Sequence, residues 1–184
     1  MAKEAAEKAC ACDPASPDAQ ITLALVNLSN RNHAKALALA ERAVSLAPSH
    51  AHVSAIASIV FVGCGKLNEA IGLVRKAIQH CPVYPVWYRT TSSRAYWAML
   101  EPEKAESEAR LTLELDPRMS YGYVVLAKSL VDQGRIDEAK QAAAAALEID
   151  PDFSIRFWVD GMPYEDPALT DRQVQALLSA GLPD

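Results

Sequence analysis

The sequence predicts an all-α solenoid of stacked helix pairs, closed at its C-terminal end by a capping helix. The first observation is a period, because prolines recur at intervals of 34, 34, 35 and 34 residues. They are Pro14, Pro48, Pro82, Pro117 and Pro151. Proline lacks an amide proton and clashes with the preceding helical turn, so it marks the end of a helix. Five terminations in one register indicate copies of one helical unit.

The second observation is a stripe of small residues at twelve, eight and five positions before each proline. In the last unit these residues are Ala139, Ala143 and Ala146. Offsets of four and three put them on one face of a helix, where small side chains let a neighbouring helix approach closely. A further helical stretch precedes each of the last four of these alanine-bearing helices, for example "SYGYVVLAKSLVD". Each unit is therefore predicted to be a pair of helices.

The period divides the chain into an array over residues 1–151 and a C-terminal cap segment over residues 152–184. The array is predicted to comprise a half repeat over residues 1–16, units over 17–50, 51–84 and 85–119, and a stretch over 120–151 that leads into the cap. Residues 1–14 correspond only to the second helix of a unit, whereas terminal units normally carry a polar cap. On this ground we expect the chain to be a fragment of a longer protein.

A 34-residue helix-turn-helix unit with this alanine stripe and terminal proline resembles the tetratricopeptide repeat (TPR). The fullest matches are "AYWAMLEPEKAESEARLTLELDP" and "YGYVVLAKSLVDQGRIDEAKQAAAAALEIDP". The first repeats depart from the pattern, since Asn27 replaces the expected aromatic residue and Arg31 the turn glycine. The resemblance covers roughly residues 1–151 and implies a right-handed superhelix that binds other proteins.

Composition argues against several functions. The formal net charge is −5, and no stretch is basic enough to follow a phosphate backbone, so nucleic acid is not expected as a partner. The longest apolar run, Val53–Gly65, is too short to span a bilayer. The N-terminus is unlike a signal peptide, and the four cysteines show no framework spacing. These features predict a cytoplasmic protein that does not bind membranes.

The sequence shows no catalytic constellation. His50, His52 and Cys64 do not have the spacing of a zinc site, and no glycine-rich loop is present to hold phosphates. We therefore predict that this chain is not an enzyme and that it has no metal site and no cofactor.

In a TPR array the first helix of each pair lines a concave groove, so residues at equal offsets form rows. The predicted groove residues are Leu25, Leu28, His52, Ile59, Val62, Trp87, Arg94, Trp97, Tyr121 and Lys128. The groove is apolar in the first two units and basic and aromatic in the last two, which predicts a peptide or partner helix with an apolar part and an acidic part. The asparagine and lysine pattern with which some TPR domains hold a C-terminal carboxylate is missing.

Two alternatives stay open for these surfaces. In the first, Trp87 and Trp97 pack against adjacent turns while Arg94 and Lys128 are solvated. The second concerns the helix over residues 51–63, which is apolar on nearly every face. Such a helix is either enclosed by its neighbours or contributes to an interface. The interface would serve self-association, or docking of a missing N-terminal part, through Ile59, Val62 and adjoining residues.

The period fails after Pro151. A short helix fits before Gly161, and "ALTDRQVQALLSAGLP" then has apolar residues at helical spacing. Asp166 and Pro167 suit the cap and first position of this helix, and Gly181 suits its end. An amphipathic final helix over the last apolar face is what an open solenoid requires.

The ending also has a more specific resemblance. "DFSIRFW", the linker "PYEDPA" and the helix end "LLSAGLP" are similar to the C-termini of bacterial TPR proteins fused to class III adenylate/guanylate cyclase domains. The resemblance implies a scaffolding or sensory region of a bacterial signalling protein. The alternatives are a dimerisation element of a multidomain enzyme and a freestanding structural adaptor. No metal-binding aspartates of a cyclase occur here, so no catalytic role is implied for this chain.

Overall fold

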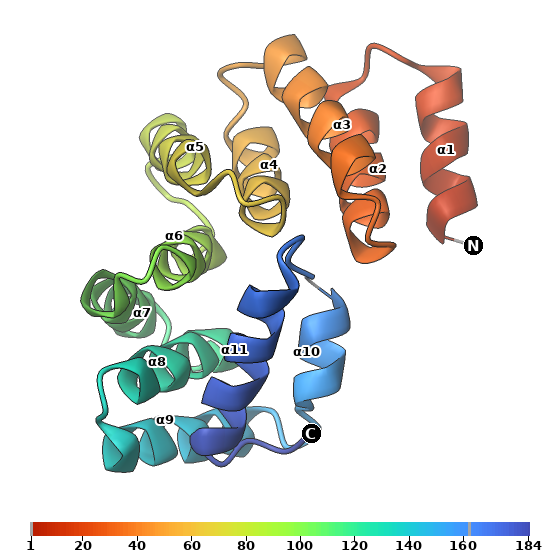
Figure 1. The fold of residues 1–184 in the computed structure, drawn as a ribbon. Helices are drawn as coiled ribbons and strands as arrows, with labels where there is room; N and C mark the ends of the chain where they lie inside the picture. The colour runs from red at the N-terminus through yellow and green to blue at the C-terminus, as the bar shows by residue number, and fades with distance from the viewer. Residues whose placement is uncertain (1, 162) are drawn as a thin grey trace. The chain divides into compact units, whose positions relative to one another are not determined.

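The computed structural model describes residues 2–161 and 163–184, with side chains from Glu4 onward. Within these residues all regular structure is helical, which confirms the all-α prediction (Figure 1). The helices are α1 (Ala2–Cys12), α2 (Pro17–Ser29), α3 (His33–Leu46), α4 (Ala51–Gly63), α5 (Leu67–His80), α6 (Trp87–Ala98), α7 (Pro102–Leu115), α8 (Ser120–Asp132), α9 (Ile136–Ile149), α10 (Ile155–Gly161) and α11 (Pro167–Ser179). No helix among the described residues is both long and apolar enough to cross a membrane.

The helices form two compact units. The first comprises residues 1–84 and 162–165 and contains α1 to α5, and the second comprises residues 85–161 and 166–184 and contains α6 to α11. This division reflects which residues of the folded chain contact one another. The division into repeats and cap made from the sequence therefore stays a prediction.

In the first unit α2 packs against α3 and α4 packs against α5, while α2 and α3 both also contact α4. The small residues of α3 explain this close packing, because Ala36, Ala40 and Ala43 are all fully buried. Helix α4 is enclosed along most of its length, since nine of its thirteen residues are buried. Val62 is one of them, so it is not available for self-association, whereas Ile59 is half-buried.

In the second unit α6 to α9 pack in sequence, and α11 lies beside α8 (Figure 1). Ala139, Ala143 and Ala146 are at most 2% exposed, as expected for the small-residue stripe. Helix α11 begins where its sequence predicts, because Asp166 Oδ1 accepts a hydrogen bond of 2.9 Å from the Ala168 amide and Pro167 follows the cap. The core here joins the repeat helices to α10 and α11.

The four turns between paired helices share one backbone conformation. Arg31, Gly65, Leu100 and Gly134 all have positive φ angles, of 59°, 72°, 63° and 74°. Glycine adopts this left-handed conformation without a steric penalty, whereas an L-residue with a side chain loses roughly 1–2 kcal/mol. The fold therefore imposes the same turn on all four pairs, even where the sequence lacks the glycine.

Candidate protein-interaction groove

The ten predicted groove residues all lie on the first helices of the pairs. Leu25 and Leu28 are on α2, His52, Ile59 and Val62 on α4, Trp87, Arg94 and Trp97 on α6, and Tyr121 and Lys128 on α8.

In the first unit the predicted residues do not all reach the surface. Leu28 and Val62 are at most 1% exposed and belong to the core, while His52 is exposed and Leu25 and Ile59 are half-buried. Leu28 packs so closely on Gly63 that a Cβ added there would lie 2.6 Å from Leu28 Cδ1. The row is thus accessible only in part.

The same unit includes the short segment Pro163–Glu165. The Glu165 amide donates a hydrogen bond of 2.7 Å to the Gly63 carbonyl, and Pro163 and Tyr164 are buried. Sequence reasoning identified this segment as a linker, but it did not place the segment against the C-terminal end of α4.

In the second unit three of the five predicted residues are covered, whereas Trp87 and Tyr121 are half-buried. Arg94 is 2% exposed, and Trp97 and Lys128 are fully buried. The alternative in which Arg94 and Lys128 are solvated is therefore wrong. The physical reason is that α11 lies against α8 and contributes contacts to Trp97 and Lys128.

The polar contacts of α11 centre on Trp97. Lys128 Nζ donates a hydrogen bond of 2.8 Å to Gln173 Oε1 and lies 4.0 Å from the centroid of the Trp97 ring. Arg172 Cζ lies 4.1 Å from the same centroid, and Arg172 Nη1 donates a hydrogen bond of 3.1 Å to the Trp97 carbonyl oxygen. Arg172 also forms an ion pair with Asp132. Cation–π contacts of this kind gain strength when the cation is removed from water.

The apolar contacts of the C-terminal helices continue the same surface. Leu177, Ala176 and Ala180 of this region are at most 4% exposed. The rings of Tyr121 and Trp158 have centroids 4.2 Å apart, so α10 covers the tyrosine. We define the groove of the second unit by Arg94, Trp97, Tyr121 and Lys128. Helix α11 contacts it at Trp97 and Lys128, and α10 contacts it at Tyr121.

The electrostatics of this groove are unusual because its positive charges are buried together. Burial lowers the pKa of the Lys128 ammonium well below its usual value, and the nearby Arg94 and Arg172 guanidinium groups lower it further while Asp132 opposes them. Burial also raises the pKa of Tyr121, although Arg94 acts in the opposite direction. The charges that act on Lys128 are thus two cations and one carboxylate.

Sequence reasoning missed Asp132, Arg172 and Gln173 as members of the groove. One signal was available, because Lys128 stands in the apolar stretch "YVVLAKSLV" and a buried lysine requires an acceptor. Which residue supplies that acceptor depends on the path of α11. Gln173 is 45 positions further along the chain.

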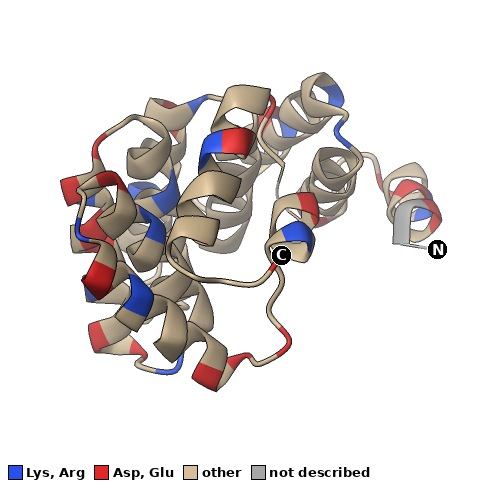
Figure 2. Ribbon diagram, turned by 60° about the horizontal axis from the view of Figure 1, so that its bottom comes forward, with Lys and Arg blue, Asp and Glu red and all other residues tan. Residues whose placement is uncertain are grey.

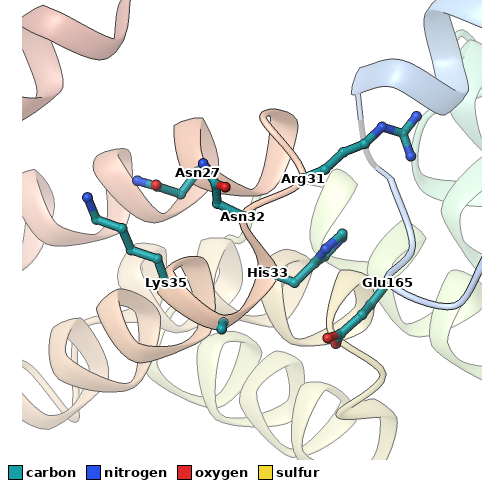
Figure 3. A pocket seen from close by; sticks show the side chains of 7 residues that line it. Asn27, Arg31, Asn32, His33, Lys35 and Glu165 are labelled. Atoms are coloured by element: carbon teal, nitrogen blue, oxygen red, sulfur yellow. The ribbon is translucent and has the colours of Figure 1, made fainter.

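Two open hollows lie in the first unit. One, of about 510 Å³, is lined by Asn27, Arg31, Asn32, His33, Ala34, Lys35 and Glu165, and Figure 3 shows Lys35, His33 and Glu165 arranged around it. The other, of about 440 Å³, includes Phe61, Leu73 and Val44, with Glu41 and Glu69 also in its wall. Neither hollow was predicted.

A metal-binding arrangement is not present among the residues that the structure describes. No group of three His, Cys, Asp or Glu side chains in that part of the chain is placed to hold a metal ion. Figure 2 shows acidic and basic residues interspersed along the described helices. Such a distribution differs from the continuous basic surface with which proteins bind nucleic acid.

Comparison with known proteins agrees with the repeat architecture. Residues 121–153 match the family model of the tetratricopeptide repeat. The solved structure of TTC0263, a thermophilic TPR protein in Thermus thermophilus, is 24% identical with a TM-score of 0.71, and the similarity covers 96% of this chain and 89% of that one. YrrB, described as a TPR protein with an unusual peptide-binding site, is 23% identical with a TM-score of 0.58, covering 97% and 92% of the two chains.

One further relative matches less than half of this chain. A STIP1 homolog of Dictyostelium discoideum is 33% identical over 84 residues, which is 46% of this chain and 15% of the relative. The chain therefore spans a small part of that protein's length. Together the helices, the period and these matches define the fold as a TPR solenoid.

Proposed function

We propose that this chain is a non-catalytic protein-interaction module that binds a helical segment of a partner protein in the groove of its second unit. The observation that carries this proposal is that the groove already receives a helix. Helix α11 lies against α8 and uses Lys128, Trp97 and Asp132 as its polar anchors. Docking of an amphipathic helix into a groove is a common mode of peptide recognition.

The arrangement suits this task for a physical reason. The groove side chains are held on the rigid helices α6 and α8, so ordering them for binding costs little conformational entropy. Tryptophan, arginine and tyrosine are residue types that often contribute most of the binding energy at interfaces, and the groove contains one of each. The peptide-binding site for which YrrB is described supports peptide binding as a function of this fold.

Within a cell we place the module in a larger bacterial signalling protein, such as an adenylate cyclase-like protein, as its scaffolding or sensory region. The support for this placement is the resemblance of "DFSIRFW", "PYEDPA" and "LLSAGLP" to the endings of such proteins. A cytoplasmic location accords with it. The alternatives remain a dimerisation element of a multidomain enzyme and a freestanding adaptor, and the coding sequence upstream of residue 1 distinguishes the parent-protein interpretations from the adaptor.

A selection experiment tests the binding function. A library of helical peptides is displayed on phage and selected against the full chain, and amide hydrogen exchange then maps the peptides that bind. We expect the exchange rates of α6, α8 and α11 to change together. Selected peptides that alter exchange only in other helices, or a library without binders at about 100 μM, would contradict the proposal.

Size-exclusion chromatography with light scattering tests the dimerisation alternative. An Ile59→Glu variant changes the half-buried face of α4, and Glu148→Gln is a control on an exposed position of α9. A wild-type dimer that becomes monomeric only with Ile59→Glu would favour the dimerisation element over the binding groove.

A further inference from the structure

We infer that the hollow of the first unit whose wall includes Glu41 and Glu69 is a second interaction site, and that it takes a partner segment in which an arginine stands beside a large apolar side chain. The hollow lies among α3, α4 and α5, so this site is separate from the groove of the proposed function and does not depend on it. The inference follows from a glycine that packing does not explain and from a cation that the first unit lacks.

The lining of this hollow combines an apolar floor with charged side chains. Phe61 of α4 and Leu73 of α5 are buried, and Val44 of α3 continues the apolar surface. Glu41 and Glu69 are exposed and belong to α3 and α5. The volume of about 440 Å³ lies within the range of pockets that bind small groups. The hollow is thus of a size to receive a large apolar side chain of a partner.

Gly72 leaves open space in the wall of the hollow at a cost to helix α5. Within a helix glycine is the least favourable residue after proline, because its backbone loses the most freedom on folding. Close packing does not require it, since a Cβ added at Gly72 would contact no other part of the described chain within 4 Å. Backbone geometry does not require it either, because Gly72 lies inside the regular helix and is not among the glycines with a positive φ angle.

The second unit contains the equivalent hollow with a side chain at the glycine position. Its residues lie 69 positions further along the chain, which is the spacing from Pro82 to Pro151. Gln141 stands there in place of Gly72 and lines a hollow of about 210 Å³, less than half the volume of the first. The larger volume in the first unit therefore accompanies the glycine.

The equivalent hollow of the second unit also contains an arginine. Arg110 stands 69 positions after Glu41, and its Nη2 lies 3.9 Å from Glu138 Oε2 and 2.8 Å from Glu106 Oε1. Glu138 is in turn the residue 69 positions after Glu69. The first unit thus keeps the carboxylate of α5 but has a second carboxylate in place of the arginine.

The charges of the first hollow call for a cation from outside. Among the residues that the structure describes, neither Glu41 nor Glu69 forms an ion pair. Lys76 also lines the hollow, so its charged side chains are two carboxylates and one ammonium. A guanidinium from a partner would take the place that Arg110 has in the second unit, and its planar fork can bind two carboxylate oxygens at once.

The two parts of the partner have different tasks. An ion pair at exposed carboxylates contributes little free energy by itself, because water screens it. Burial of an apolar side chain against Phe61 and Leu73 therefore provides most of the binding. The arginine then selects this segment over neutral and acidic ones.

Four synthetic tripeptides, acetylated and amidated, test the inference by NMR titration of the full isotope-labelled chain. The first is Arg-Phe-Arg, in which an arginine on each side of the phenylalanine can reach either wall. In the others citrulline replaces both arginines, alanine replaces the phenylalanine, or glutamate replaces both arginines. We expect Arg-Phe-Arg to bind with a Kd of about 1 mM and to shift the amide signals of α3, α4 and α5 around Gly72. The citrulline peptide should bind about fivefold more weakly, the alanine peptide at least about tenfold more weakly, and the glutamate peptide weakest of all.

Variants that copy residues of the second unit into the first provide the matched controls. Glu41→Arg supplies the missing arginine from within the chain, and Gly72→Gln supplies the missing side chain. Each should weaken the binding of Arg-Phe-Arg by about fivefold or more. The Tm of Gly72→Gln should be at or above that of the wild type, since glutamine favours a helix more than glycine does. Glu148→Arg reverses the same charge at an exposed position of α9 and should leave the affinity unchanged.

Several results would overturn the inference. These are equal affinities of the arginine and citrulline peptides, equal affinities of wild type and Glu41→Arg for Arg-Phe-Arg, shifts confined to other helices, and no binding at about 10 mM. A wild-type dimer that Gly72→Gln converts to a monomer would also overturn it, because the occupant would then be a second copy of this chain. Signals of α6 and α8 report on the proposed function separately, so either proposal can fail while the other stands.

Discussion

The buried lysine makes the stability of the second unit depend on pH in a way that a single substitution removes. Lys128 is fully buried, and its Nζ contacts Gln173 Oε1 and the Trp97 ring. The Lys128→Met substitution keeps a similar side-chain length and deletes the titrating group. Arg94 from α6, Asp132 from α8 and Arg172 from α11 remain in both proteins, so the difference between the two isolates the lysine.

The sign of the effect follows from the protons bound by each state. In the unfolded chain the lysine keeps its ordinary pKa of about 10.4 and is protonated at neutral pH. In the folded chain burial lowers the pKa of Lys128 well below that value, with Arg94 and Arg172 lowering it further. Between these two pKa values the unfolded state binds one more proton, so the free energy of unfolding increases with pH by about 1.4 kcal/mol per unit. Above the unfolded pKa the penalty for burying the lysine is absent.

Urea denaturation of both proteins at several pH values from about 6 to about 10 measures this effect. The wild type is expected to gain stability relative to Lys128→Met as the pH rises, by up to about 1.4 kcal/mol per unit. At the upper end of this range the wild type should approach its largest stability relative to Lys128→Met, because the neutral lysine keeps its hydrogen bond to Gln173 without the cost of burying a charge. A stability difference that stays constant across the range would show that Lys128 stays hydrated or charged in the folded chain, and would refute its desolvation beneath α11.

Two further predictions concern the turns and a buried thiol. Leu100 is 68% exposed and has a left-handed backbone conformation, so Leu100→Gly should stabilise the fold by about 0.5–1 kcal/mol in thermal or urea unfolding. Gly134→Ala should destabilise it by a similar amount. Changes of the same sign for both variants would contradict the turn argument. Burial raises the pKa of the Cys64 thiol to about 11, and Glu165 and Glu41 add to the effect. Because maleimide reacts with the thiolate, it should label Cys64 at about pH 8 far more slowly than the exposed Cys12. Equal labelling rates in mass spectrometry would contradict the burial of Cys64.

The repeat architecture was predictable from the sequence because its signals are local. A proline ends the helix that precedes it, and an alanine such as Ala143 determines how closely a neighbouring helix approaches. These effects act within one repeat and recur in each one. The cap helix was predictable for the same reason, since Asp166 and Gly181 act on the backbone next to them.

The turns show how the fold can override local preference. Arg31 and Leu100 occupy positions where glycine would be favoured, yet both adopt the left-handed conformation. The packing of the paired helices on either side imposes this geometry at a modest cost in free energy. A sequence pattern based on glycine alone would miss two of the four turns.

Periodic local signals are enough to identify an array of helix pairs, with aromatic and basic side chains on the first helices of its last two pairs. What those side chains contact depends on how distant helices pack. Gln173 and Arg172 reach Lys128 and Trp97 from 45 and 75 positions away, and no local pattern specifies such an approach. The burial of Lys128 and its lowered pKa depend on that long-range packing of α11, because a lysine is desolvated only when another element covers it.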